Sequence, residues 1–411
     1  MNNGMFGLPP GLPPVSGLGL GQGVGPTFMY QKVKAYCKPG TYAAERVPDR
    51  VKTALAMVFG GGGDGYASSS SSAYSGAGGG FAMAEFPVTP GELLPPIIVG
   101  DRAGTSSFGQ FLSATGGSHA TSSAHGTGGV GAVMAGLKNA LAYPGGSPTG
   151  GIGSLIQGGG SSGSPYGPGV GPASNQGGGG GWGTAPTDGN TLGGNGKYKN
   201  VASGGYGTGG AGSQASNFGS YGEHGGYGFD SQTNWGFVFN SGFSTPPAVG
   251  DFGGRQSTFH DLLMIPYLES IGGAGGAGIQ YQANVSNTPY PMLTAGDGGP
   301  WAGGGGIYVD TATSYTFNLR AGNGGIGGGG GGIWNSSGIL CNVAIGGKGG
   351  FGGGGGGVNP ANSSGTYNIQ IGGDGGIAGG GGGCAYIQTN SVSRAGMGGV
   401  GTVLVFYLEG N

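Results

Sequence analysis

Few residues of this 411-residue chain have the types and spacing that catalysis or metal binding requires. Its four histidines stand apart from each other and from the three cysteines, and none has the spacing of a zinc ligand: His119, His125, His224, His260, Cys37, Cys341 and Cys384. Three scattered cysteines without a Cys-x-x-Cys pair predict reduced, mostly buried thiols. No paired carboxylates and no His-based constellation occur at catalytic spacing. We therefore expect no enzymatic activity, no cofactor and no metal.

Glycine-rich motifs that bind nucleotides or build nucleophile elbows carry little weight here. With 114 glycines, about nine accidental matches to the dinucleotide fingerprint are expected. Lys348 is followed by Gly349 rather than by the Ser or Thr of a phosphate loop. Residues 159–163 spell a nucleophile elbow, but their flanks are Gly and Ser rather than a strand and a helix.

Two aspartates, Asp297 and Asp374, occupy the same position of a repeated Gly-x-Gly-Gly motif. Asn323 and Lys348 hold that position in the two repeats between them. Calcium-binding glycine repeats need an Asp at the same position of every repeat. Two interpretations stay open: a structural ion at two sites, or solvated carboxylates in turns.

The composition excludes several classes of protein. Only 7% of residues are charged and the net charge is −2, which argues against nucleic-acid binding and against charge-driven disorder. Glycine comes in blocks rather than at every third residue, unlike collagen. No stretch approaches the ~20 apolar residues of a membrane span, and the first residues do not read as a signal peptide. We expect no membrane insertion, and synthesis in a cytoplasm.

Apolar segments alternate with glycine blocks in the first third of the chain. Residues 52–59, 81–86 and 97–99 are predicted strands, and Pro90-Gly91 is predicted to form a turn. We divide the chain into an extended Pro/Gly-rich arm at 1–30, a glycine-rich β domain at 31–130, a Gly/Ser-rich irregular insertion or linker at 131–270, and a repeat domain at 271–411. The arm is either a docking segment for another protein or a loose terminus.

The Gly-x-Gly-Gly motif occurs six times in the last region, starting at residues 273, 296, 322, 347, 373 and 396. The near-constant interval is a repeat signature. Alternating strands precede several copies, as at Tyr315, Phe317 and Leu319, and residues 402–408 read as a buried strand.

Glycine runs without side chains can form polyproline II rods that bond sideways through their peptide groups. The core would then consist of backbone, and loops between the strands could vary without touching it. We therefore predict a mostly β fold with little helix, in which glycine-rich repeats, short strands and polyproline II (polyglycine II) rods pack as a bundle or sandwich.

Two segments give the chain a resemblance to a known family. The first runs from Pro39-Gly40-Thr41-Tyr42 through GGGFAMAEFPVTPGELLPPIIVG to Phe108-Gly109, and the second is the Gly-x-Gly-Gly array. Both resemble the glycine-rich domains of bacteriophage tail fibres and tail-tip adhesins. The resemblance implies a virion protein, often a homotrimer, that is held by other tail or baseplate proteins and binds a host polysaccharide or outer-membrane protein through its loops.

The resemblance gives roles to two sets of residues. The candidates for tail attachment lie in the arm: Leu8, Pro9, Pro10, Leu12, Pro13 and Pro14. The candidates for receptor contact are mostly aromatic and lie near the ends of glycine tracts, where they could instead seal the bundle: Trp301, Tyr308, Trp334, Asn335, Tyr367 and Tyr386. Two alternative functions stay open, a structural glycine-rich material or ice-binding polyglycine bundle, and a cell-envelope polysaccharide depolymerase.

Overall fold

The computed structural model describes residues 30–69, 73–149, 158–165, 167–172, 178–182, 222–223, 278–281, 293–294, 297–298, 303–309, 316–335, 340–360, 368–385 and 392–409. These residues form twenty strands and contain no helix, so the predicted mostly β class is confirmed. In this part of the chain there is consequently no helix that could cross a membrane.

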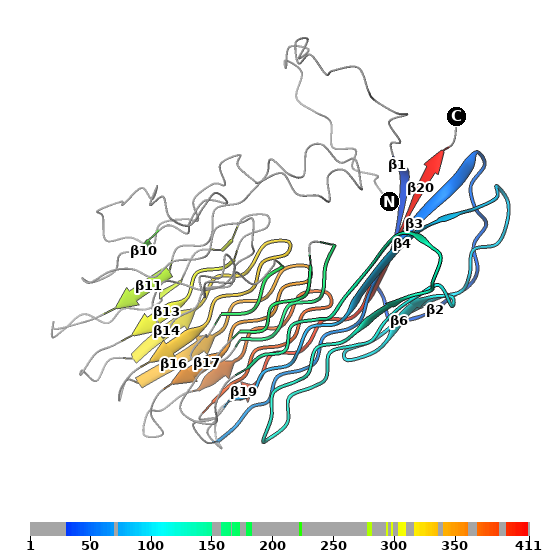
Figure 1. The fold of residues 1–411 in the computed structure, drawn as a ribbon. Coiled ribbons are helices and arrows are strands. Elements are labelled where there is room, and N and C mark those ends of the chain that lie inside the picture. The colour runs from blue at the N-terminus through cyan, green and yellow to red at the C-terminus, as the bar shows by residue number, and fades with distance from the viewer. Residues whose placement is uncertain are drawn as a thin grey trace, which may run out of the picture.

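Two antiparallel five-stranded sheets pack face to face at one end of the molecule (Figure 1). Sheet I has the order β1 (Tyr30–Tyr36), β20 (Thr402–Glu409), β3 (Val51–Phe59), β4 (Phe81–Pro87) and β9 (Lys138–Tyr143). Sheet II has the order β2 (Gly40–Tyr42), β5 (Ile97–Val99), β6 (Ser106–Phe108), β7 (Leu112–Ala114) and β8 (Gly131–Val133). The strands predicted at 52–59, 81–86, 97–99 and 402–408 are therefore present.

Strand alternation divides β3 between two cores. Ala54, Ala56 and Val58 belong to a cluster shared with sheet II, together with Phe108 and Leu112. The alternate residues of the strand lie in a second cluster on the opposite face of sheet I: Leu55, Met57 and Phe59. Since successive strand side chains point to opposite faces, sheet I is covered on both sides.

The strand pairing differs from the expected division of the chain at two places. β20 lies between β1 and β3, so the last strand of the expected repeat domain is part of the sandwich. β8 and β9 fall in the segment expected to be irregular, yet they pair with β7 and β4. The Gly/Ser-rich composition of this segment led to the prediction of irregular structure, because composition does not indicate which strands a segment pairs with.

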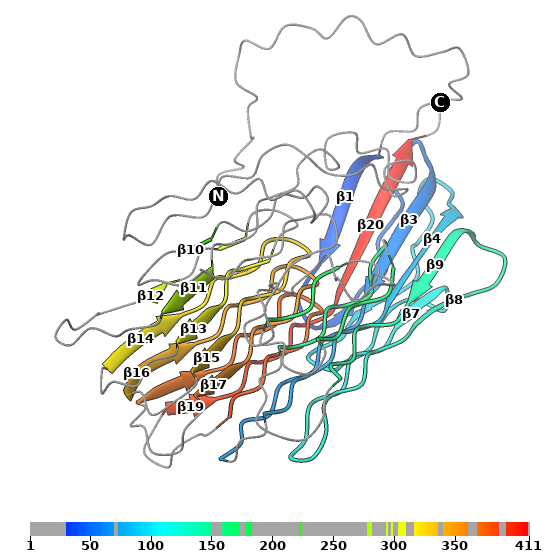
Figure 2. The ribbon, with the colours of Figure 1, turned by 60° about the vertical axis from the view of Figure 1, so that its left-hand side comes forward.

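Two further sheets, built mainly from parallel strands, lie at the other end of the molecule (Figure 2). Sheet III has the order β10 (Gly222–Glu223), β11 (Gly278–Tyr281), β13 (Ile307–Val309), β15 (Ile333–Asn335) and β17 (Val358–Pro360), with only β10 antiparallel to its neighbour. Sheet IV has the order β12 (Leu293–Thr294), β14 (Thr316–Arg320), β16 (Leu340–Ile345), β18 (Ile369–Ile371) and β19 (Val392–Arg394).

The register of sheet IV follows the repeat intervals of the sequence. Leu293 pairs with Leu319, 26 residues later, and Leu319 with Ala344, 25 residues later. The next two offsets are 26 and 23 residues, to Gln370 and then from Ile369 to Val392. The last four intervals between Gly-x-Gly-Gly motifs have the same lengths, so each motif marks one rung.

The glycine tracts run between the two ends as long parallel segments (Figure 1) and hydrogen bond sideways through their main chains. The amide of Gly354 donates to the Gly180 carbonyl at 2.9 Å, and that of Gly380 to Gly160 at 2.8 Å. Tracts far apart in sequence thereby join one lattice. It includes residues 60–65, 76–80, 158–163 and 178–181 as well as the C-terminal repeats.

At its glycine positions this lattice leaves no space for side chains. A Cβ on Gly354 would lie 1.9 Å from the Gly159 oxygen, and one on Gly159 would lie 2.0 Å from the Gly380 oxygen. Real Cβ atoms essentially never approach within 3.0 Å. The core of this part of the molecule therefore consists of peptide groups.

An aromatic cluster joins sheet I to the lattice. Trp182 stacks on Phe59 with a ring-centroid distance of 5.9 Å and meets Phe351 edge-on at 5.5 Å. Its indole N–H donates to Ser162 Oγ at 2.8 Å, so the buried polar atom is satisfied. Trp182 thus connects the sandwich to a repeat turn and to the segment 158–163.

Candidate functional site

The connections between sheets III and IV all leave from the same end of the bundle. β15 ends at Asn335 and β16 begins at Leu340, and one repeat later β17 ends at Pro360 and β18 begins at Ile369. Because these strands are parallel, the carboxyl ends of β13, β15 and β17 lie side by side, and so do the starts of β14, β16 and β18 (Figure 2). We call this region the loop end; it is the candidate site for contact with a partner.

A ladder of asparagines runs across the loop end of sheet IV. Asn342 Nδ2 donates to Asn318 Oδ1 at 3.2 Å, and Asn368 Nδ2 donates to Asn342 Oδ1. Adjacent rungs of a sheet lie about 4.8 Å apart, which suits such side-chain pairs. The ladder links the starts of three neighbouring strands, β14, β16 and β18, and adds no charge.

Three of the predicted receptor residues lie in adjacent strands of sheet III. Tyr308 of β13 is the register partner of Trp334 of β15, and Asn335 pairs with Val309. The side chain of Trp334 is half-buried, and its partner in the next strand, Asn359, is buried. The remaining candidates lie outside the described residues: Trp301, Tyr367, Tyr386, Leu8, Pro9, Pro10, Leu12, Pro13 and Pro14.

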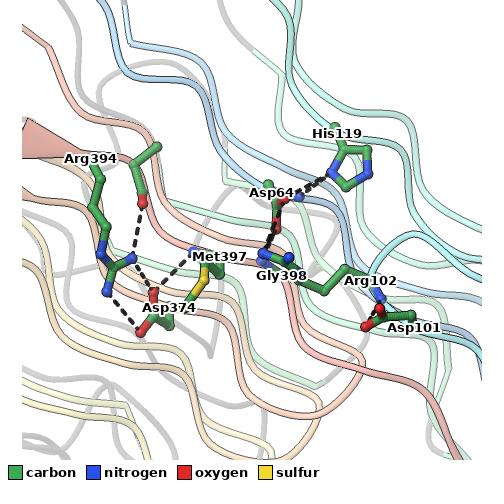
Figure 3. A network of polar contacts seen from close by, with 9 residues as sticks. Asp64, Asp101, Arg102, His119, Asp374, Arg394, Met397 and Gly398 are labelled. Carbon is green, nitrogen blue, oxygen red and sulfur yellow. Dashed lines mark hydrogen bonds and ion pairs between the residues drawn. The ribbon is translucent and has the colours of Figure 1, made fainter. Parts of the chain in front are cut away.

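Asp374 forms the centre of an ion-pair network on the last repeats (Figure 3). Arg394 donates to its two carboxylate oxygens at 2.7 and 3.3 Å, the amide of Met397 donates at 3.0 Å, and Lys348 Nζ lies 3.8 Å away. Burial opposes ionisation of this carboxyl, but the Arg394 and Met397 hydrogen bonds and the positive charges lower the pKa of Asp374. A carboxylate held in this way fixes a turn.

A second carboxylate, Asp64, connects the first glycine tract to the last repeat (Figure 3). It accepts the amide of Gly398 at 2.8 Å and faces Arg102 Nη1 at 3.4 Å. Residues 64 and 398 are 334 positions apart. This hydrogen bond therefore joins two segments that lie far apart in the sequence.

The two aspartates of the repeat motif do not come together. Asp297 accepts the amide of Asn323 at 2.7 Å, and Asn323 Oδ1 accepts the amide of Lys348 at 2.9 Å. Each side chain thus binds the main chain of the next rung. No three His, Cys, Asp or Glu side chains in the described part of the chain gather where they could hold a metal ion.

The serines of the elbow-like sequence are lattice residues. Ser161 and Ser162 are buried, Ser161 Oγ donates to the Gly181 carbonyl at 2.9 Å, and Ser162 Oγ accepts from Trp182. Among the cysteines, Cys384 is buried as expected, and burial raises the pKa of its thiol to about 12. Cys37, in contrast, is exposed beside Thr402.

No family model matches this chain, and no curated protein matches it.

Two histidines that the sequence left without a role lie on one hairpin turn. His119 Nδ1 accepts the amide of Asp64 at 2.9 Å, and His125 Nδ1 accepts the amide of Ser75 at 3.1 Å. Their separation of six residues in the sequence is a weak indication that they flank one turn, since it fits the two strands of a short hairpin. Which backbone groups they meet depended on segments about 50 residues away.

Proposed function

We propose that the chain is a phage tail fibre or tail-tip protein that attaches the virion to a receptor on the host cell surface. The observation that supports this most is the loop end, where the strand ends that flank successive connections lie side by side. The sequences of these connections, such as ANSSGTY at 361–367, are rich in Ser, Asn, Gly and Tyr. Antigen-binding loops share this composition, because Tyr gives rigid contact area and small polar residues give adaptable hydrogen bonds.

The lattice supplies the rigidity that such a surface needs. Its rods are bonded to one another on several sides through main-chain groups of the glycine tracts. A receptor-binding surface could therefore change in sequence without loss of the core. The receptor would be a polysaccharide or an outer-membrane protein, and the aromatic residues at 301, 308, 334, 367 and 386 would contact it.

The proposed assembly presents several copies of the loop end on one virion. The arm at residues 1–30 would attach the chain to other tail or baseplate proteins, and a homotrimer would present three loop ends. Several weak contacts on one virion then act together, which raises the overall avidity by orders of magnitude. This activity requires binding alone, without a cofactor or a chemical step.

The test is competition for adsorption. The purified chain should bind bacteria of a strain infected by the phage that encodes it, and should inhibit adsorption of that phage. A variant with residues 361–367 replaced by an equal number of Gly and Ser residues should fold but compete poorly. The matched control replaces residues 89–92 at the sandwich turn while keeping Gly91, which has φ +80°.

The control variant should compete like the wild type. The proposal is refuted if the wild-type chain binds no host cells, or if both replacements compete equally well. Release of reducing sugar from host polysaccharide would favour the depolymerase instead, and thermal hysteresis or fibre formation would favour a glycine-rich material.

A further inference from the structure

The two-histidine turn is hydrogen bonded at two points, one at the end of the glycine tract 60–65 and one just before the tract 76–80. At one point the amide of Ala120 donates to the Asp64 carbonyl at 2.8 Å. At the other, the amide of Gly126 donates to the Ser75 carbonyl at 3.0 Å. Residues 121–125 lie between these bonds, His119 lies just before the first of them, and Thr121 to Ala124 are exposed.

A histidine ring completes each point of attachment. The amides of Asp64 and Ser75 would need carbonyl acceptors if the lattice continued, and imidazole nitrogens take that role instead. A ring nitrogen that accepts a hydrogen bond carries no proton. The His125 ring that accepts the Ser75 amide is therefore neutral, with its proton on Nε2.

The charged surroundings of the two rings differ. Asp64 Oδ2 lies 3.3 Å from His119 Nδ1, and Arg102 lies behind that carboxylate at 3.4 Å. The Asp64 carboxylate therefore lies within ion-pair distance of the His119 ring. The neighbour of His125 is the ring of Tyr74, edge-on at 5.0 Å, and no carboxylate of the described chain forms an ion pair with His125.

We propose that His125 is an acid-released latch. When neutral, it accepts the Ser75 amide and holds the turn 118–127 against the chain around residue 75. When a solvent proton binds Nδ1, two N–H groups face each other and the contact opens on this side, while the His119–Asp64 side persists. This inference concerns the fold itself and does not depend on the proposed receptor function.

The direction of the pH dependence follows from burial. Burial lowers the pKa of His125 from its ordinary value of 6.5, so the folded chain binds the proton less readily than the unfolded chain. The stability that the latch contributes is complete above about pH 6.5 and is lost as the pH falls toward the lowered pKa.

Amide hydrogen exchange at Ser75 and Gly126 tests the latch, with each rate divided by the intrinsic rate at the same pH. Between pH 7.5 and 5.0 the wild-type protection should fall roughly threefold to tenfold, the equivalent of one hydrogen bond. In His125→Asn, the Oδ1 atom replaces Nδ1 as acceptor but does not titrate, so protection should stay constant. His119→Asn is the matched control and should retain the wild-type pH response.

His125→Ala should show weak protection at both pH values. The proposal is overturned if wild-type protection at Ser75 does not change with pH, or if His125→Asn loses it as the wild type does. Should the alanine variant fail to fold, the comparison of wild type with the two asparagine variants still decides.

Discussion

Replacing Gly354 by alanine tests whether backbone packing forms the core. Gly354 lies inside the lattice, where its amide donates to Gly180 and its carbonyl accepts from Gly330, both at 2.9 Å. The neighbouring rod contributes a third bond, from the Gly159 amide to Gly355 at 2.7 Å. The added methyl group would lie 1.9 Å from the Gly159 oxygen.

The expected loss of stability in Gly354→Ala follows from how far the backbone has to move to make room for the methyl group. To restore an ordinary contact of 3.4 Å, Gly354 must move about 1.5 Å away from the Gly159 oxygen, which exceeds the tolerance of its own bonds to Gly180 and Gly330 and of the bond from Gly159 to Gly355. A buried group that loses its partner costs about 1–3 kcal/mol, so the substitution should cost roughly 3–9 kcal/mol. The total stability of a domain is about 5–15 kcal/mol, and Gly354→Ala should be severely destabilised or insoluble.

Gly91→Ala is the matched control, because a Cβ there meets no atom within 4 Å while the residue has φ +80°. It should cost about 1–2 kcal/mol from the left-handed backbone alone. Guanidinium unfolding of both variants gives the two free energies of unfolding. If Gly354→Ala were soluble and within about 1 kcal/mol of Gly91→Ala, the rods would not be in contact and the reasoning would fail.

Three further substitutions test other parts of the fold. Gln370 is buried opposite Ala344, and both polar atoms of its side-chain amide lack a hydrogen-bond partner among the described residues. Gln370→Leu should therefore raise the free energy of unfolding in guanidinium titration by about 1–3 kcal/mol, and a lower free energy of unfolding would contradict this. Trp182→Ala should cost about 3–5 kcal/mol by the same measurement, and a cost below 1 kcal/mol would show that the aromatic cluster does not join the two parts. Asp374→Asn should lower the free energy of unfolding at neutral pH and remove one step from its dependence on acid pH. The ion pair with Arg394 stabilises the fold above about pH 3.8, and this effect is lost as the pH falls through the lowered pKa of Asp374. An unchanged dependence of stability on acid pH would refute this role.

The strands and the repeat interval could be predicted from the sequence because both are local patterns. Residues 52–59 and 402–408 are apolar runs next to glycine blocks, and the Gly-x-Gly-Gly copies fix the offsets between rungs. Rod pairing could not be predicted in the same way. No side chain distinguishes one glycine block from another, so nothing in residues 158–160 indicates that they bond to Gly355 and Gly380.

The candidate site was predictable only in part for the same reason. The sequence places Tyr308 and Trp334 one repeat apart, and the register makes them neighbours. The contacts of Asp64 with Gly398 and of His119 with Asp64 join segments that no periodic pattern relates. Trp182 lies in a Gly/Ser-rich stretch that resembles a linker, and only its packing on Phe59 reveals a role in the core.

The two ends of the chain are interlocked, and this affects how the repeats can be tested. Repeat arrays need a cap, because the last rung would otherwise expose its backbone groups. Here the cap is the first glycine tract: the Gly62 amide donates to Gly399 at 2.7 Å, and Asp64 accepts from Gly398. β20 then lies between β1 and β3, so the sandwich requires the final residues as well. Deleting residues 271–411 would remove β20 and the lattice partners of residues 60–65 together with the loop end. Loss of adsorption by that deletion could reflect unfolding, so a test of receptor binding has to replace connections and keep residues 396–409.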